Sequence, residues 1–429
     1  MRATTPPMGW NSWDCYGTTV TEDEVLANAR HLAEHLLPLG WDTVVVDIAW
    51  YDPTAKAHGY NADAPHTLDG FGRQQPAANR FPSAVDGAGF APLAAQVHAL
   101  GLRFGLHLMR GIPRLAVERD LPIEGTEWTA RDAADTSDTC AWNPDNYGLN
   151  FAHPAAQAYM DGQIALFASW GLDFIKVDDM LAPYHDDAIE ALALAIERSG
   201  RDIVVSLSPG THLSTQHVPH LTEHAQMWRI SDDLWDRWED IHAQFARLAR
   251  WAPFQRPGAW ADADMIPLGR IGIRAERGEP RDSRLTLDEQ RTLLTLWSMA
   301  RSPMMLGGDL PTSREDTLAL LANPAITTVV EGSTDGREVT REPLEGGELI
   351  AWSACDARSE RRYAALFWTG EADHAARVPL ASLTGLPHRP LTVTHLWEGV
   401  TDARVDGTDL VATIPAHGVV WVALDEAAA

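Results

Sequence analysis

The stretch Asp173-Phe174-Ile175-Lys176-Val177-Asp178-Asp179 decides how the rest of the chain is interpreted. Its apolar residues predict a buried parallel strand, and such strands normally consist of aliphatic side chains throughout. A lysine inside the strand and carboxylates at its C-terminal end are costly to bury unless a polar site lies there. In a (β/α)8 barrel, catalytic groups emerge at the C-terminal ends of the strands. The stretch therefore predicts a barrel strand that ends in a polar site.

Lysine is rare in this chain, which makes the lysine of this strand informative. Of the 34 basic residues, only Lys56 and Lys176 are lysines. A compact ammonium with three donors fits where a planar guanidinium does not. We interpret Lys176 as a ligand-contacting residue, and the alternative is an ion pair at the end of the strand.

Helical and strand patterns alternate on both sides of this stretch. The predicted strand segments are residues 43–47, 103–107, 203–208, 228–233, 257–265 and 303–306. The predicted helices cover about residues 21–39, 90–100, 154–170, 186–199 and 235–251, and another helix begins at Thr286. About eight strands, each followed by a helix or a segment of helix length, predict a (β/α)8 TIM barrel. Residues 111–153 lack a clean period, and a connection of that length is usually functional.

The pattern changes after residues 323–324. Short apolar runs at 349–352, 363–368, 391–393 and 419–422 are separated by Gly, Asp and Pro turns and have no helical partners. Such runs predict an antiparallel β-sandwich. We expect a catalytic barrel at 1–327 and a C-terminal antiparallel β domain at 328–429.

Composition narrows the class of protein. The formal net charge of -26 disfavours nucleic acid and anionic membranes as partners, but does not repel a neutral substrate. The three cysteines, Cys15, Cys140 and Cys355, are too few and too widely spaced for a disulfide framework or a structural zinc site. The N-terminus has no apolar leader and no 18-residue apolar run follows, so we expect a cytoplasmic protein. The sequence is compatible with a homo-oligomer.

Polar residues gather at the predicted C-terminal strand ends. They are Asp47, His107, Lys176, Asp178, Ser208, Arg229, Asp232, Asp233, Asp262 and Asp264. Several carboxylates with cations and a tryptophan-rich composition indicate glycoside hydrolysis, in which two acids share the chemistry. A divalent-metal isomerase or hydrolase is a second class, because hard cations bind clustered oxygens. A non-catalytic sugar-binding barrel is a third.

Four motifs in order resemble glycoside hydrolase family 27, the α-galactosidase family. They are Pro6-Pro7-Met8-Gly9-Trp10-Asn11-Ser12-Trp13, Lys176-Val177-Asp178, Trp228-Arg229 with Asp233 four residues later, and Pro257-Gly258-x-Trp260-x-Asp262-x-Asp264-Met265. The resemblance implies a retaining enzyme with a barrel and a C-terminal antiparallel domain, acting on a small glycoside or oligosaccharide. It implies no metal and no organic cofactor.

The resemblance also implies roles for individual residues. Asp178 matches the nucleophile and Asp233 the acid/base, and we interpret Asp232 as structural. The residues expected to bind substrate are Trp13, Asp47, Ile48, His107, Lys176, Ser208, Arg229, Asp264 and Met265.

The chain departs from the family pattern at four places. His107 replaces a tyrosine of the best-known members, and Ser208 lies near a glutamate of some members. Cys140 lies near a cysteine of the family that forms a disulfide, and Met180 occupies the position of that cysteine's disulfide partner. Ile48 replaces the acid that binds the 6-hydroxyl of galactose. Since β-L-arabinopyranose is α-D-galactopyranose without its C5 hydroxymethyl group, Ile48 predicts a β-L-arabinopyranosidase, with a plain α-galactosidase as the alternative.

Overall fold

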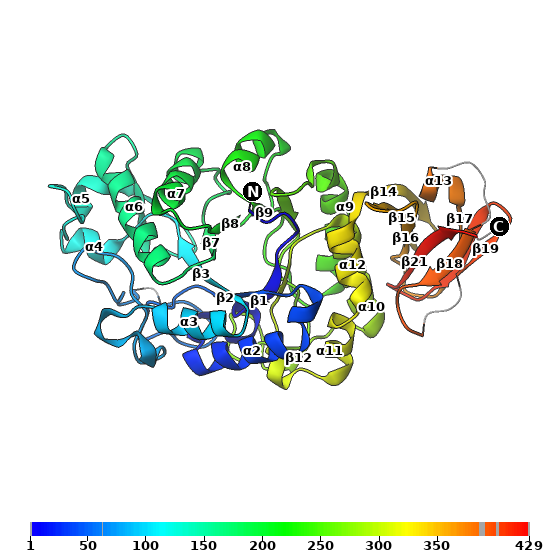
Figure 1. The fold of residues 1–429 in the computed structure, drawn as a ribbon, viewed down its shortest axis with the longest axis horizontal. Coiled ribbons are helices and arrows are strands. Elements are labelled where there is room, and N and C mark those ends of the chain that lie inside the picture. Colours follow the sequence, from blue (N-terminus) through cyan, green and yellow to red (C-terminus); the bar gives the residue numbers. More distant parts are fainter. Residues whose placement is uncertain (1, 62, 386–390, 400–402, 428–429) are drawn as a thin grey trace.

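The computed structural model describes residues 2–61, 63–385, 391–399 and 403–427. Figure 1 shows a large part made of strands surrounded by helices and, beyond α9, α10 and α12, a smaller part made mostly of strands. The polypeptide passes from the first to the second once, so the two parts follow each other in sequence.

The large part is built on an eight-stranded parallel sheet with the order β10-β9-β8-β7-β3-β2-β1-β13. An isolated parallel bridge between Ile266 and Leu306 brings the two ends of the sheet together. The strands are β1 (Met8–Asn11), β2 (Thr43–Val46), β3 (Arg103–Met109), β7 (Phe174–Asp178), β8 (Val204–Leu207), β9 (Met227–Arg229), β10 (Trp260–Asp262) and β13 (Met304–Leu306). The TIM barrel predicted from the sequence is confirmed.

Helices cover the outside of this sheet. The longer ones are α2 (Glu22–His35), α3 (Ala91–Ala99), α6 (Pro154–Ser169), α7 (Asp186–Ser199), α9 (Trp238–Trp251), α10 (Leu287–Ala300) and α12 (Pro324–Gly332). The shorter ones are α1 (Trp13–Tyr16), α4 (Arg114–Glu118), α5 (Ala130–Ala133), α8 (Val218–His224) and α11 (Glu315–Leu321). Capping boxes start α2 at Thr21 and α10 at Thr286, because in each case a glutamate three residues later bonds back to the first backbone N–H.

Residues 111–153 contain a small antiparallel sheet of their own. Its order is β4 (Ile112–Pro113), β6 (Asn146–Leu149) and β5 (Ala134–Thr139). These strands are short and β5 is almost entirely polar, which is why the sequence showed no period there. A second small pair, β11 (Arg270–Ile271) and β12 (Arg281–Asp282), lies between β10 and α10.

The C-terminal part consists of two antiparallel sheets. One has the order β14 (Ser333–Leu344), β15 (Gly347–Asp356), β16 (Arg362–Trp368), β21 (Val419–Glu426) and β18 (Leu391–His395). The other has β17 (His374–Pro379), β20 (Asp409–Ile414) and β19 (Arg404–Asp406), and the short helix α13 (Leu380–Thr384) follows β17. Their facing side chains form a separate apolar core. The antiparallel β-sandwich is confirmed.

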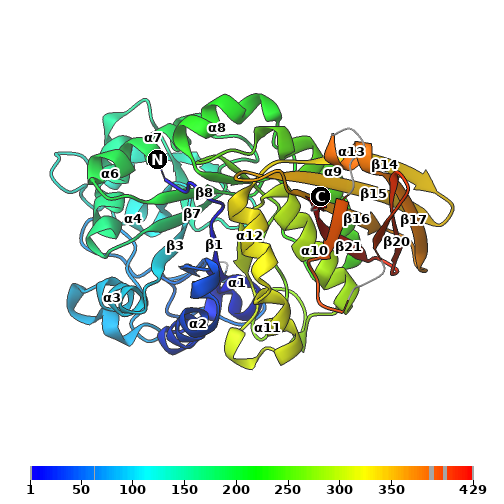
Figure 2. The ribbon, with the colours of Figure 1, turned by 45° about the vertical axis from the view of Figure 1, so that its right-hand side comes forward.

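The sandwich packs on several helices of the barrel: Phe367 of β16 meets Phe245 of α9 at 5.0 Å, and other contacts reach α10. Figure 2 shows α10 and α12 beside the C-terminal sheets. The Trp397 indole donates to Thr295 Oγ1 of α10 at 2.8 Å, and the Trp421 indole lies 3.3 Å from the sulfur of Met299. The expected division at 327/328 falls inside α12, and β14 begins at Ser333, so the division between domains stays a prediction.

The structure also bears on membrane crossing and on the state of the cysteines. Within the described ranges, no helix combines the length and the apolar character that a membrane crossing requires. Cys15, Cys140 and Cys355 are free thiols.

Candidate active site

A cavity of about 530 Å³ opens at the C-terminal ends of the barrel strands. Of the residues that the sequence assigned to catalysis or substrate binding, six line it: Trp13, Asp47, Ile48, Lys176, Asp178 and Asp233. They come from segments that follow β1, β2 and β9 and from β7 itself, so the barrel brings together residues that are far apart in the chain.

Asp178, the last residue of β7, is held by three neighbours. His107 Nε2 lies 2.8 Å from Asp178 Oδ2, and Ser208 Oγ donates to Oδ1. The Lys176 ammonium is 3.9 Å from Oδ2. Burial would raise the pKa of Asp178, but Lys176, His107 and Ser208 together hold it below its ordinary value. The carboxylate is therefore ionised and fixed in position, as a nucleophile requires.

Lys176 connects Asp178 to a second buried carboxylate. Its Nζ donates to Asp47 Oδ2 at 2.9 Å, and the Asn11 side-chain amide donates to the same oxygen at 2.7 Å. Burial would lower the pKa of Lys176, but Asp47 and Asp178 raise it, so the ammonium stays charged. Lys176 thus forms the ion pair that was the alternative interpretation, and it also lines the cavity, where it can donate to a ligand.

Ile48 lies on the cavity wall directly after Asp47. Its side chain is 2% exposed. The Ile48 N–H donates to Asp47 Oδ1 at 2.8 Å, so the isoleucine also orients its neighbour through the backbone. The Ile48 side chain gives the wall an apolar surface and has no acceptor of its own.

Asp233 lines the same cavity and is held by Arg229. Arg229 Nη2 donates to Asp233 Oδ1 at 3.1 Å, and Nη1 pairs with Asp264 Oδ1 at 2.8 Å. The N–H of Leu234 donates to Asp264 Oδ2 at 2.6 Å, which ties the loop after Asp233 to Asp264. Burial raises the pKa of Asp264 to about 7, and Asp233 adds to the rise, although Arg229 opposes it.

Five of the residues expected to bind substrate lie behind the cavity wall. His107 and Ser208 have no exposed surface and touch Asp178. Arg229, Asp264 and Met265 line a smaller cavity inside the barrel. We therefore expect His107 and Ser208 to act on substrate through Asp178, and Arg229 through Asp233.

The interpretation of Asp232 as a structural residue is wrong. Its side chain is exposed and lines the cavity beside Asp233. Among the residues that the structure describes, it has no hydrogen-bond or ion-pair partner. Only Asp233 of the two is bound by Arg229.

Sequence reasoning missed the residues that reach the cavity from loops. Tyr60, Trp142, Arg237, Glu276 and Arg277 line it. The Trp13 and Tyr60 rings stack at 5.7 Å, and Tyr60 meets Trp142 at 5.9 Å. Trp142, which is 41% exposed, belongs to the 111–153 segment, so this insertion supplies part of the rim. The sequence offered two signals for these residues, the large number of tryptophans and the length of the 111–153 connection.

Comparison with known proteins places this geometry among glycosidases. The family profile described as "Alpha galactosidase A" matches residues 146–331. A glycoside hydrolase family 27 β-L-arabinopyranosidase from Geobacillus stearothermophilus, solved with arabinose, is 44% identical, with 99% of this chain and 98% of that one covered and a TM-score of 0.94.

Two further relatives are named for activity on other sugars. A Bacillus halodurans protein, a proposed α-N-acetylgalactosaminidase, is 39% identical, with 100% and 99% covered and a TM-score of 0.88. The α-galactosidase of Cyamopsis tetragonoloba is 24% identical over 96% of this chain and 84% of that protein.

Proposed function

This chain belongs to glycoside hydrolase family 27, and from that premise we propose that it is a retaining exo-acting β-L-arabinopyranosidase with weaker α-D-galactosidase activity. Asp178 is proposed as the nucleophile and Asp233 as the acid/base. The substrate is a glycoside or oligosaccharide that ends in β-L-arabinopyranose.

The observation that carries the choice of sugar is Ile48 on the cavity wall. Arabinopyranose carries hydrogen at C5 where galactose has a hydroxymethyl group, so an aliphatic wall suits the smaller sugar. Asp47 and Lys176, which are held together at 2.9 Å, remain available for the ring hydroxyls that the two sugars share. An apolar site rejects an added hydroxyl only weakly, by about 10²-fold, so residual activity on galactosides is expected.

The proposed chemistry has two displacements. In the first, an Asp178 carboxylate oxygen attacks C1, the bond from C1 to the leaving oxygen breaks, and Asp233 gives its proton to that oxygen. In the second, Asp233 takes a proton from water, the water oxygen attacks C1, and the bond to Asp178 breaks. Two inversions give net retention, the outcome expected when two carboxyl groups lie about 5 to 5.5 Å apart.

The surroundings of the Asp233 carboxyl bear on its proposed role as the acid/base. Its side chain is 40% exposed and paired with Arg229. A sugar seated in the cavity would cover the exposed side of Asp233. Arg229, which also pairs with Asp264, fixes the position of Asp233.

The alternative is an α-galactosidase, which the curated relative from Cyamopsis tetragonoloba supports. It requires another polar residue to reach the 6-hydroxyl past Ile48. A metal-dependent barrel enzyme is disfavoured because Lys176 and Arg229 already supply positive charge to the four carboxylates that they contact.

A panel of nitrophenyl glycosides tests the proposal. We expect the highest kcat/KM with the β-L-arabinopyranoside. Faster cleavage of the α-D-galactopyranoside would overturn the choice of sugar and leave the family unaffected. Proton NMR of the first-formed arabinose tests the mechanism, since an inverted anomer would contradict a covalent intermediate on Asp178.

A further inference from the structure

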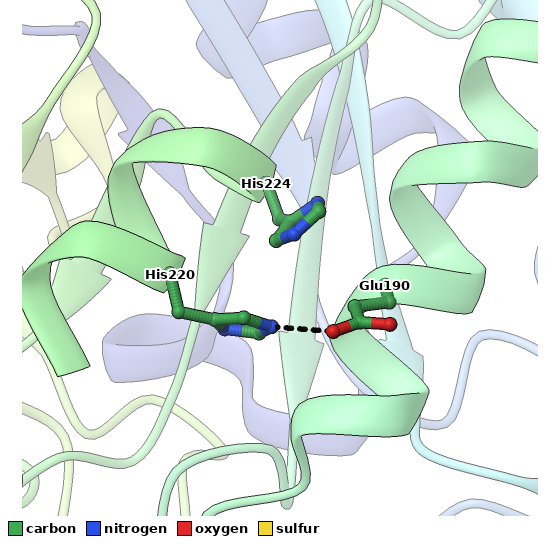
Figure 3. A group of neighbouring side chains, drawn as sticks. All are labelled: Glu190, His220 and His224. Atoms are coloured by element: carbon green, nitrogen blue, oxygen red, sulfur yellow. Dashed lines mark hydrogen bonds and ion pairs between the residues drawn. The ribbon is translucent and has the colours of Figure 1, made fainter.

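A second group of ligating side chains lies outside the barrel, between α7 and α8. Figure 3 shows Glu190 of α7 and His220 and His224 of α8 directed toward the space between the two helices. One ligand atom from each residue lies within 4.8 Å of the other two. Residues four apart share one face of a helix, which is why both histidines face α7. We propose that these three side chains bind one divalent transition-metal ion.

The hydrogen bonds of His220 prepare it as a ligand. Its Nδ1 lies 2.6 Å from the Tyr184 hydroxyl, and its Nε2 lies 3.3 Å from Glu190 Oε1. When Nδ1–H donates to the Tyr184 hydroxyl, the Nε2 lone pair faces the Glu190 carboxylate oxygen. A cation between these two atoms would accept electron pairs from both. Ligating histidines commonly donate their other ring N–H to such a partner, which fixes the tautomer.

His224 supplies the third ligand. Its ring lies beside that of His220, with centroids 4.6 Å apart. In the described part of the chain, neither ring nitrogen of His224 has a hydrogen-bond or ion-pair partner. A nitrogen lone pair is therefore free for coordination.

The donor set selects the class of ion. Two imidazoles and one carboxylate suit Zn²⁺, Ni²⁺ and Cu²⁺, whereas Mg²⁺ and Ca²⁺ prefer oxygen ligands throughout. Three protein ligands leave a position for water. Glu190 is 60% exposed and His220 is 23% exposed, so an ion can enter from solvent.

The location predicts a bracing role. Tyr184 belongs to the segment between β7, which ends at Asp178, and α7, and the His217 ring stacks on Tyr184 at 3.7 Å. A bound ion would therefore hold α7, α8 and this segment together. Because none of its ligands lines the active-site cavity, the ion should change stability and leave catalysis unchanged, and the inference does not depend on the proposed substrate.

The chain contains a matched control on α2. His31 and His35 have the same spacing, and their ring centroids are 4.5 Å apart. The carboxylate beside His35 is Glu34 of the same helix, at 3.8 Å, and no neighbouring helix completes a three-ligand group there within the described ranges. His35→Ala therefore removes a histidine of a similar pair without touching the proposed site.

Zinc binding to the full chain tests the inference. Protein stripped with EDTA and dialysed is titrated with Zn²⁺ in competition with a fluorescent chelator. We expect one site in the wild type and in His35→Ala, with affinity at least tenfold weaker in His224→Ala. Tyr184→Phe should weaken binding by about tenfold, as loss of an outer partner does. Saturating zinc should raise the Tm of the wild type and His35→Ala, but not that of His224→Ala.

Two results would overturn the inference. One is equal zinc affinity in the wild type and His224→Ala, and the other is an equal loss in His35→Ala and His224→Ala. The kcat/KM of His224→Ala on a nitrophenyl glycoside should match that of the wild type, which shows that the variant is folded.

Discussion

Replacing Ile48 with aspartate should move the preference of the enzyme from arabinopyranoside to galactoside. A hydrogen bond to a charged group is worth about 1.5–3 kcal/mol, so the new carboxylate should favour the galactoside, through its 6-hydroxyl, by about 10- to 100-fold. With arabinopyranose bound, the same carboxylate is covered without a partner, at a further cost of about 1–3 kcal/mol. Lys176 cannot offset this cost fully, because it already pairs with Asp47 and Asp178.

These contributions together predict a change of about 10²- to 10⁴-fold in the ratio of the two kcat/KM values, at 1.4 kcal/mol for each factor of ten. The ratio is measured with nitrophenyl β-L-arabinopyranoside and nitrophenyl α-D-galactopyranoside. Ile48→Asn is the matched control, because it offers an acceptor of the same shape without the charge, and Ile48→Val keeps the wall apolar. If Ile48→Asp leaves the ratio unchanged while the protein stays folded, Ile48 does not face C5 and the substrate argument fails.

Four further outcomes are expected. Asp233→Ala should lower kcat/KM on glycosides with alkyl or sugar leaving groups by at least about 10²-fold and largely spare nitrophenyl glycosides; the reverse pattern in Asp232→Ala would exchange the two roles. His107→Phe should shift the acid limb of kcat/KM to higher pH, because the pKa of Asp178 rises and the ionised form is lost sooner as pH falls; an unmoved limb would show that His107 does not stabilise the carboxylate. EDTA should leave kcat/KM unchanged, whereas a loss restored by a divalent ion would support a metal-dependent reaction. Trp142→Ala should raise KM for oligosaccharides more than for methyl glycosides, and equal effects would place Trp142 outside the aglycone site.

The sequence predicted the barrel and the strand-end residues because both depend on local patterns. Alternation of strands and helices identifies the barrel, and the barrel alone brings Asp47, Lys176 and Asp178 to one end. The partners of Asp178 depend on strand register, which local patterns do not specify. His107 pairs with Lys176 across β3 and β7, and β8 pairs with β7 so that Ser208 follows Leu207 beside Asp178. The sequence therefore identified both residues but assigned them to substrate.

Residues carried by loops were the ones that the sequence could not place. Tyr60 and Trp142 come from segments without a period; Tyr60 packs against Trp13, and Trp142 packs against Tyr60. The orientation of the Asp232 side chain, in the loop after β9, could not be predicted from the sequence either. The spacing from Arg229 identified Asp233, whose carboxylate lies 3.1 Å from the guanidinium, but the exposure of Asp232 to the cavity depends on how the loop folds.

Under the proposed function, the one cavity lysine gives a physical reason why substrate binding and the ionisation of Asp178 would be coupled. Its ammonium has three donors, of which one bonds Asp47 at 2.9 Å and none is within hydrogen-bond distance of Asp178, which is 3.9 Å away. Two donors are thus left for ring hydroxyls, while the charge still lowers the pKa of Asp178 through space. An arginine would direct its donors in a fixed planar fork toward the carboxylates. A chain that otherwise uses arginine therefore gains, from lysine at this position, a cation that stabilises two carboxylates and keeps donors for the sugar.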